Sequence, residues 1–317
     1  MERRLFLCAV VLDYLLGDPI NWPHPIVYIG KVIAFYEKQI RKTMRNLKFG
    51  GILLVFFSLI TVIGSSHIIL KLARKIHPIL ESFFILYFIY ALLAAKCLHI
   101  ESKKVYQKLQ EGEVEQAREK ISYLVGRDTS KLGLEEITRA TIETVAENTI
   151  DGVIAPMFYG VIGFCLGYPI EYMLFYKTVN TLDSMVGYIQ QPYKDIGYAS
   201  AKLDDILNYI PARIGSIFMI LAGGMLGYDV KNAFSILKRD RRNHKSPNCA
   251  YPESAVAGLL HIQLGGSNIY FGQKLEKPTI GDKTRSFYPQ DILSTIRIMY
   301  ASQILFLVVS IGLLSWI

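Results

Sequence analysis

Long apolar stretches alternate with polar ones along this chain. Two of them, Gly50 to Leu70 and Ile298 to Ile317, carry no formally charged side chain. Each is about 20 residues long, the length that a helix needs to cross the hydrocarbon core of a bilayer. A third stretch, Ile79 to Leu98, is nearly as apolar and has Glu81 and Lys96 near its ends. The pattern predicts an all-α, polytopic integral membrane protein with about four to six membrane-embedded helices.

Three further apolar segments are weaker candidates for membrane spans. Leu5 to Leu16 is short and contains Asp13; we interpret it as a retained first helix, because no small-residue cleavage site follows it. Val153 to Tyr176 is interrupted by Gly and Pro, so it either crosses the bilayer or enters and returns. Tyr209 to Gly227 contains Arg213 near its start.

The polar segments between these stretches cover about 17–49, 99–152, 177–208 and 228–297. We expect short helices in the second and loops with short helices in the fourth, within a single membrane-embedded catalytic domain spanning 1–317. The first segment is rich in Lys and Arg, which predicts a cytoplasmic location. If successive apolar segments cross the membrane in alternating directions, 177–208 lies on the side opposite to 99–152 and 228–297. Either 153–176 is re-entrant or 177–208 dips into the membrane, and both solutions stay open.

Composition narrows the function classes. The chain has 317 residues, 51% of them hydrophobic, and a formal charge of +8. In a membrane protein this charge favours contact with anionic lipid, so we expect no nucleic-acid partner. The four cysteines form no CxxC pair, which predicts neither a disulfide framework nor a zinc site. Walker A, GxGxxG and nucleophile-elbow patterns are absent from the sequence, so any ATP site is unconventional.

The first group of candidate residues is Arg139, Glu143, Glu147 and Asp151, spaced by four and therefore aligned on one helical face. Carboxylates in a row at the entrance to an apolar segment repel each other unless a cation lies between them. Such oxygen-rich sites suit Mg²⁺, often with substrate phosphates as further ligands. The alternative is a solvated helix face with an Arg139–Glu143 ion pair.

The second group is Lys177, Asn180 and Asp183, in a stretch dense in small polar residues beside an apolar segment. Polar groups at membrane depth are costly unless they bind something. The alternative is hydrogen bonding between helices, which Ser, Thr and Asn commonly supply.

The third group is Asp204, Asp205 and Asn208, followed by Arg213. Paired aspartates are typical of Mg²⁺–phosphate sites, although the dipeptide alone is a weak signal. An arginine inside an apolar segment normally has an anionic partner. This partner is either a bound phosphate or simply Asp204 or Asp205.

The fourth group is a basic stretch with Arg239, Arg242, His244 and Asn248, followed by Glu253. Guanidinium groups suit phosphate and carboxylate ligands, whereas the alternative is a basic loop at a lipid surface. His244 is either a proton carrier or an ordinary surface residue. Asp13 and Asp18 near the N-terminus form a fifth, smaller group.

Five ordered blocks carry a resemblance to a known family. They begin at Leu12-Asp-Tyr-Leu-Leu-Gly-Asp-Pro, Glu143-Thr-Val-Ala-Glu-Asn-Thr-Ile-Asp-Gly, Tyr176-Lys-Thr-Val-Asn-Thr-Leu-Asp-Ser, Asp204-Asp-Ile-Leu-Asn-Tyr-Ile-Pro-Ala-Arg and His244-Lys-Ser-Pro-Asn, the last continuing to Tyr251-Pro-Glu-Ser-Ala-Val-Ala-Gly, Leu264-Gly-Gly and Tyr270-Phe-Gly. Together they resemble the adenosylcobinamide-phosphate synthases of cobalamin biosynthesis, the CobD/CbiB family. Two positions depart from the family's pattern: Cys249-Ala250 stands where a Gly is usual, and the Gly-rich stretch at 163–167 is altered.

The resemblance implies an ATP-dependent ligase that joins the propionate carboxylate of adenosylcobyric acid to aminopropanol or its O-phosphate. It implies ATP and Mg²⁺ as cofactors, a corrinoid and a small amine (phosphate) as substrates, and a multi-pass protein of the cell membrane whose active site faces the cytoplasm. Association with other late cobalamin-pathway enzymes is compatible with it, and the oligomeric state stays open. Activation of the carboxylate as an acyl phosphate is our hypothesis.

From the patterns and the resemblance we assign three sets of roles. The expected catalytic residues are Glu143, Glu147, Asp183, His244 and Glu253. The expected substrate or phosphate ligands are Lys177, Asn180, Arg213, Arg239, Arg242 and Asn248. The expected metal ligands, which we predict to converge, are Glu147, Asp151, Asp204 and Asp205. Two rival functions stay open: a Mg²⁺-dependent membrane transferase acting on a diphosphate, and a transporter for corrinoids or cobalt.

Overall fold

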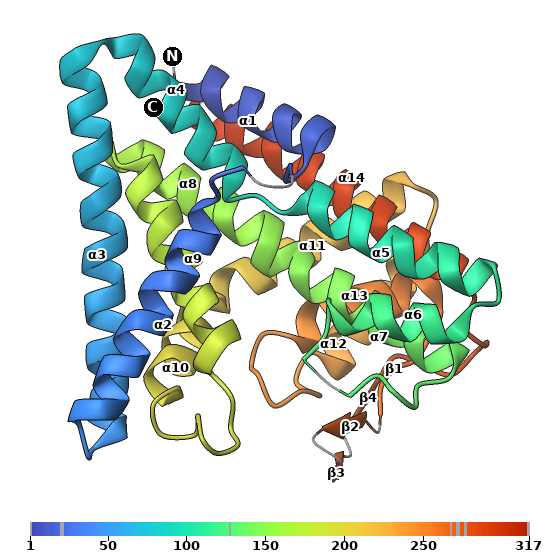
Figure 1. Cartoon of the computed structure of the whole chain (residues 1–317). Helices are drawn as coiled ribbons and strands as arrows, with labels where there is room; N and C mark the ends of the chain where they lie inside the picture. The colour runs from blue at the N-terminus through green and yellow to red at the C-terminus, as the bar shows by residue number, and fades with distance from the viewer. Residues whose placement is uncertain are drawn as a thin grey trace. The chain divides into compact units, whose positions relative to one another are not determined.

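Helices make up most of the regular structure of the chain (Figure 1). The computed structural model describes residues 2–19, 22–126, 128–266, 268–270, 273–275 and 278–315. Phe271 and Gly272 of the Tyr-Phe-Gly block lie outside these residues. By their contacts the residues form two units. Unit 1 comprises Met1–Ala94, Ala155–Asn208 and Ser310–Ile317, and unit 2 comprises Ala95–Ile154 and Tyr209–Val309.

Unit 1 contains seven elements before its C-terminal segment. They are α1 (Glu2–Leu16), α2 (Pro25–Thr43), α3 (Leu47–Ile76), α4 (Pro78–Ala91), α8 (Ala155–Leu166), α9 (Pro169–Val186) and α10 (Tyr198–Leu207). Helices α2, α3 and α9 pack against one another, and α10 contacts both α3 and α9 (Figure 1). The α2 helix begins at Pro25 because His24 accepts a hydrogen bond from Ile26 N–H and thereby caps it.

Unit 2 contains the polar helices and two small β-ribbons. Its elements are α5 (Ala95–Gln110), α6 (Val114–Ser122), α7 (Leu134–Asn148), the π-helix η1 (Thr149–Ile154), α11 (Tyr209–Met225), α12 (Val230–Asp240), α13 (Ala250–Leu260), β1 (Leu264–Gly265), β2 (Asn268–Tyr270), β3 (Gln273–Leu275), β4 (Thr279–Ile280) and most of α14 (Gln290–Leu314). Strand β1 pairs with β4 and β2 with β3, both antiparallel. Helix α13 packs against α7, α11 and α12.

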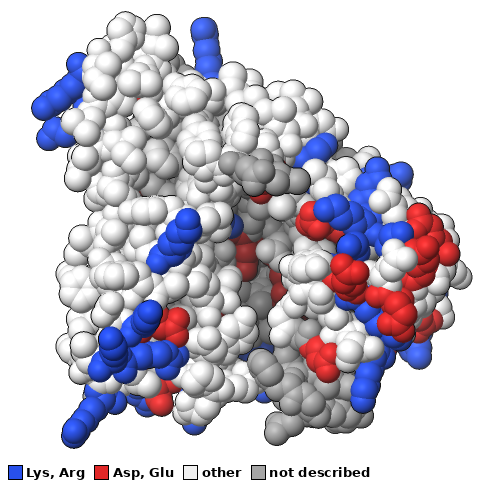
Figure 2. Space-filling model, viewed as in Figure 1, with Lys and Arg blue, Asp and Glu red and all other residues white. Residues whose placement is uncertain are grey.

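Length and composition identify four helical runs in the described residues that are able to cross a membrane: Leu47–Ile76, Pro78–Gln110, Leu134–Leu166 and Gln290–Leu314. A fifth is added if α10 and α11, which are separated by a break at Asn208, count as one broken span. The predicted all-helical membrane protein is therefore confirmed. In Figure 2 the side of α3 between its ends is almost free of charge, whereas charged groups of both signs gather over α5 and α6.

The apolar segment 153–176 is not one helix. Its chain turns after Leu166, and α8 and α9 pack as a hairpin. A Cβ on Gly163 would lie 2.6 Å from Pro169 Cα, so this close approach requires glycine. The interruption that the sequence shows at 163–169 is therefore a helix-to-helix turn.

Candidate functional site

The α9–α10 cluster of unit 1 is built around the Asp204 carboxylate. Asp204 is 9% exposed and accepts hydrogen bonds from Asn180 Nδ2 at 3.3 Å and Asn208 Nδ2 at 3.0 Å. The amide oxygen of Asn208 in turn accepts from Tyr176 O–H at 2.9 Å. Amide donors hold the carboxylate in one orientation while leaving it further lone pairs. Asn208 was a candidate without an assigned role, and Tyr176 was not a candidate, although it begins one of the recognised blocks.

Asp183 lies on the same helix as Asn180, close to this cluster. Burial, followed by the charges of Asp204 and Asp205, raises the pKa of Asp183 to about 7. Helix α9 is not among the candidate spans of the described residues. A carboxyl group that titrates near neutral pH can both donate and accept a proton, as acid–base catalysis requires.

The other polar side chains of α9 and α10 have local partners. Thr181 and Ser184 donate to the carbonyls of Lys177 and Asn180, one turn earlier in α9. Asp205 lies 3.5 Å from Lys202. Thr181 and Ser184 thus bond within α9, whereas Asn180 and Tyr176 bond between helices, to Asp204 and Asn208. Lys177 also lines a cavity of about 430 Å³ together with Asp18 and His24.

In unit 2, Glu143 and Arg139 hold the backbone of Gly265. Gly265 N–H donates to Glu143 Oε1 at 2.9 Å, and Arg139 Nη1 donates to Gly265 O at 2.6 Å. The two side chains are themselves 3.8 Å apart, as the ion-pair interpretation expected. Glu143 therefore has a clear structural contact, which attaches β1 to α7.

Arg213 lies between two aromatic rings. Its guanidinium carbon is 3.3 Å from the ring centre of Tyr209 and 4.3 Å from that of Tyr251. The same group donates to Tyr209 O at 2.6 Å and to Asn248 Oδ1 at 3.3 Å. Two of the expected phosphate ligands, Arg213 and Asn248, are thus in direct contact. The aromatic rings orient the cation without neutralising it.

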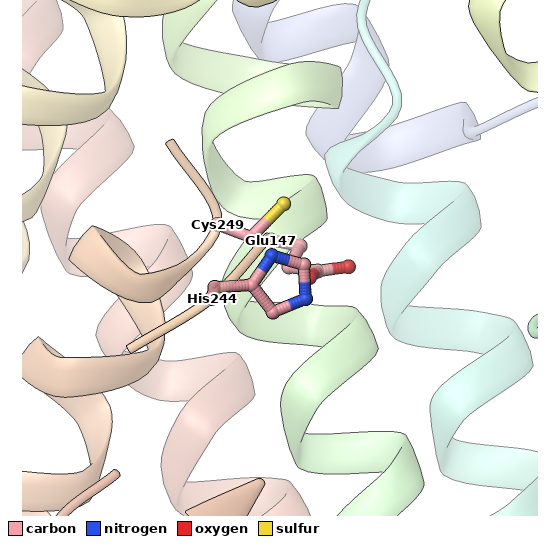
Figure 3. A group of neighbouring side chains, drawn as sticks. All are labelled: Glu147, His244 and Cys249. Atoms are coloured by element: carbon pink, nitrogen blue, oxygen red, sulfur yellow. The ribbon is translucent and has the colours of Figure 1, made fainter. Parts of the chain in front are cut away.

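Residues around Cys249 join two of the recognised blocks. Glu147 from α7 and His244 and Cys249 from the loop between α12 and α13 place one ligand atom each within 4.8 Å of one another (Figure 3). Burial, and then the charges of Glu147, Asp151 and Glu253, raise the pKa of the Cys249 thiol. Glu147, Asp151, His244, Cys249 and Glu253 thus lie in one region of unit 2. Cys249 was not expected in a site, because Glu147 is about a hundred residues away in the chain.

The two arginines expected to bind phosphate in the basic stretch differ: Arg239 is held in ion pairs, and Arg242 is exposed. Arg239 forms a two-bond fork with Asp240, with both distances 2.8 Å, and its third nitrogen lies 2.9 Å from Asp282. Asp240 is only 4% exposed and also accepts from Gly281 N–H. Arg242 is exposed. Arg239 therefore holds the loop structure, a role that sequence spacing did not show.

The expected convergence of four metal ligands stays a prediction. Asp204 and Asp205 belong to unit 1, and Glu147 and Asp151 belong to unit 2. Within unit 2, Asp151 lies in η1, one turn of a π-helix beyond Glu147. Single π-helical turns often occur at functional sites because the widened turn changes the direction of the following side chains.

Comparison with known proteins gives a consistent result. A family model described as "CobD/Cbib protein" matches residues 6–299. Proteins called cobalamin biosynthesis protein CobD from Clostridium tetani and Listeria monocytogenes are 45% and 47% identical; the alignments cover 96% and 97% of this chain and 95% and 97% of theirs. Cobalamin biosynthesis protein CbiB from Salmonella arizonae is 42% identical over 98% of this chain and 96% of its own. No solved structure matches.

Proposed function

Because the chain belongs to the CobD/CbiB family, whose relatives are named for cobalamin biosynthesis, we propose that it is an amide ligase of that process. The substrates are adenosylcobyric acid, ATP and (R)-1-amino-2-propanol or its O-phosphate. The product is adenosylcobinamide or its phosphate. The amide bond forms on the membrane, at a site facing the cytoplasm.

One observation carries the proposal. Residues from three separate sequence blocks bring a cation, an amide and several carboxylates together in unit 2. Arg213 contacts Asn248, while Glu147, Asp151 and Glu253 lie close enough to Cys249, the next residue, to raise the pKa of its thiol. A guanidinium held by aromatic rings suits a phosphate, and carboxylates suit a magnesium ion or a proton transfer.

The chemistry requires two displacements. A carboxylate oxygen of the corrinoid attacks the γ-phosphorus of ATP, and ADP leaves. The amine nitrogen then attacks the carbonyl carbon, phosphate leaves, and the nitrogen loses a proton to a base. We assign phosphate binding to Arg213, Asn248 and Arg242 in unit 2 and to Lys177 in unit 1, and proton transfer to Glu253 in unit 2 or to Asp183 in unit 1. Asp183, with its pKa of about 7, is suited to such a transfer.

The chain's aspartates fit the Mg²⁺ that accompanies ATP. Asp204 and Asp205 of unit 1 offer only oxygen ligands, and hydrogen bonds from Asn180 and Asn208 orient Asp204. Bound Mg²⁺ would neutralise charge on the transferring phosphoryl group. Glu147 differs, because a thiol and an imidazole lie next to it. That mixed set of ligand atoms does not fit a magnesium ion.

Mass spectrometry tests the proposal against its two rivals. Purified protein is incubated with adenosylcobyric acid, ATP, Mg²⁺ and aminopropanol phosphate. The ligase forms the amide with one ADP per product. A transferase acting on a diphosphate would instead release a phosphate group without ADP, and a transporter would move corrinoid across vesicles unchanged. Corrinoid that keeps its mass in the presence of every substrate would contradict the ligase.

A further inference from the structure

The cluster of Glu147, His244 and Cys249 combines three kinds of metal-binding atom. The carboxylate comes from the last turn of α7, and the imidazole and the thiol come from the loop that connects α12 to α13 (Figure 3). All three side chains are half-buried, so an ion can reach them from water while being partly shielded from it. His244 and Cys249 are five residues apart in one loop, whereas Glu147 is about a hundred residues away and meets them only in the folded chain.

Ligand chemistry selects the ion. Magnesium and calcium bind oxygen almost exclusively. Thiolate sulfur and imidazole nitrogen favour softer ions, and a tetrahedral set of Cys, His and Glu is typical of Zn²⁺. With Zn–S near 2.3 Å and Zn–N and Zn–O near 2.0 Å, ligand atoms in a tetrahedron are separated by roughly 3.3–3.8 Å. Separations within 4.8 Å therefore need side-chain adjustments of about 1 Å.

Binding of the ion changes the hydrogen bonding of the loop. Ser246 N–H now donates to His244 Nδ1 at 3.0 Å. This bond is lost whichever ring nitrogen of the neutral imidazole binds the ion. If Nδ1 binds, its lone pair is donated to the metal. If Nε2 binds, Nδ1 carries the proton and can no longer accept. The loss of this hydrogen bond is small beside the free energy with which structural sites bind zinc.

Further carboxylates strengthen the case for a cation. Asp151 and Glu253 lie close enough to Cys249 to act on its thiol electrostatically. Glu253 is only 4% exposed. With Glu147, these groups concentrate negative charge around a side chain that becomes an anion when it binds metal, and a divalent ion offsets that charge. Either carboxylate is a candidate for the fourth ligand; water is the other.

We propose that Glu147, His244 and Cys249 form a binding site for one divalent ion of borderline softness, with Zn²⁺ as the ion that fits best. The site is separate from the magnesium that accompanies ATP. It does not depend on the ligase reaction, because its tests measure ion content and thiol protection.

Ion content gives the first test. Tag-free protein in detergent is stripped with EDTA and dialysed against micromolar Zn²⁺ in the presence of millimolar Mg²⁺. We expect about one zinc per chain in the parent and a loss of at least about 10-fold in affinity for Cys249→Ser and His244→Gln. Cys97→Ser is the matched control, because Cys97 is also a half-buried cysteine outside any disulfide, and this substitution should leave zinc content unchanged. Zinc content equal to the parent in the Cys249→Ser, His244→Gln double variant would overturn the proposal.

Thiol protection gives a second test that needs no variant. Alkylation of the unmodified protein is followed residue by residue with mass spectrometry, with and without Zn²⁺. Zinc should slow alkylation of Cys249 by about 10-fold or more, because the bound thiolate is no longer free to react, and should leave Cys97 unaffected. Co²⁺ in place of Zn²⁺ should give a near-ultraviolet thiolate charge-transfer band. Equal alkylation rates with and without zinc would exclude Cys249 as a ligand.

Discussion

Arg213 shows how a single residue acquires a function from its neighbours. The sequence left two interpretations: a phosphate ligand, or a structural partner of Asp204 or Asp205. In unit 2 its guanidinium lies between Tyr209 and Tyr251 and donates to an amide and a carbonyl oxygen. None of these contacts neutralises its charge. Its position thus favours a role in binding an anion.

Arg213→Ala should leave the protein inserted and folded but remove ligation. Loss of a charged hydrogen bond to a phosphate costs about 2–5 kcal/mol, roughly 30- to several-thousand-fold in rate or affinity. Arg213→Lys should also fail, since an ammonium cannot stack flat between two rings or form a fork. Product formation and a detergent melting curve are measured together. Near-normal kinetics in a well-folded Arg213→Ala protein would remove the residue from the site.

Asp183 makes stability depend on pH. Its pKa is raised from 3.8 to about 7, chiefly by burial. The folded protein therefore binds this proton more tightly than the unfolded chain, so the stabilisation is complete below pH 4 and is lost as the pH rises to about 7. A shift of about 3 units corresponds to at most about 4 kcal/mol. The Tm should fall between pH 5 and pH 8.

Asp183→Asn should flatten this curve, because the amide keeps the hydrogen-bonding shape of the protonated acid and does not titrate. Tm in detergent is recorded at several pH values for parent and variant, and the gap between them should widen in favour of the variant above pH 7. Parallel curves would mean that Asp183 has an ordinary pKa in the folded protein.

Arg239 and Arg242 offer a matched comparison of two arginines three residues apart. Arg239→Gln leaves the buried Asp240 without its two-bond partner, which should cost about 1–3 kcal/mol. Arg242→Gln, at an exposed position, should change the free energy of unfolding by no more than about 0.5 kcal/mol, so its Tm should stay close to that of the parent. Melting temperature decides the point. If both variants have the same Tm, the ion pair between Arg239 and Asp240 contributes no stability to the fold.

At the scale of elements, the site depends on how α7, η1, α12 and α13 pack. Helix α7 brings Glu147 to its last turn, and η1 carries Asp151. The loop that holds His244 and Cys249 runs between α12 and α13, so its shape follows from the contact between those helices. A residue at that contact can therefore disturb the site without touching it.

Gly258→Ala tests this dependence. A Cβ at Gly258 would lie 2.4 Å from Ala233 Cα, and backbone atoms cannot rotate away. The two helices must separate, at a cost of about 1–3 kcal/mol. Gly64→Ala is the control, since Gly64 is also inside a helix and has nothing within 4 Å of the added atom. We expect a lower Tm and faster Cys249 alkylation only for Gly258→Ala. If Tm rose for both variants, α12 and α13 would be far enough apart to accommodate the methyl group added at Gly258.

At the scale of the whole molecule, sequence periodicity predicted the helices well. The predicted span Gly50–Leu70 falls within α3, and the predicted span from Ile298 lies in α14 as far as Leu314, because twenty apolar residues leave few alternatives to a helix in lipid. Residue types also indicated the Asp204 cluster, since Asn208 is one turn from Asp204. Contacts that depend on tertiary packing were not predictable. Cys249 meets Glu147 across about a hundred residues, and Arg239 pairs with Asp282.

The orientation of α3 decides which face of the membrane carries the chemistry. At 30 residues, α3 is about 45 Å long and exceeds the hydrocarbon core. The 17–49 segment before it has six Lys and Arg, whereas its own last turns carry Lys71, Arg74 and Lys75. Positive charge favours the cytoplasm, so the α2–α3 turn should be inside and the α3–α4 turn outside.

Cysteine accessibility tests this orientation together with the cytoplasmic location of both long polar segments. In a background with Cys8, Cys97, Cys165 and Cys249 replaced by Ser, single cysteines are introduced at Arg45, Ile76, Lys120 and Lys245. Intact cells should label only Ile76→Cys with an impermeant reagent, because Ile76 ends α3 on the less basic side and is 74% exposed. Inside-out vesicles should label the other three. Labelling of Lys120→Cys or Lys245→Cys in intact cells would place that segment outside, away from cytosolic ATP, and the ligase could not then work as proposed.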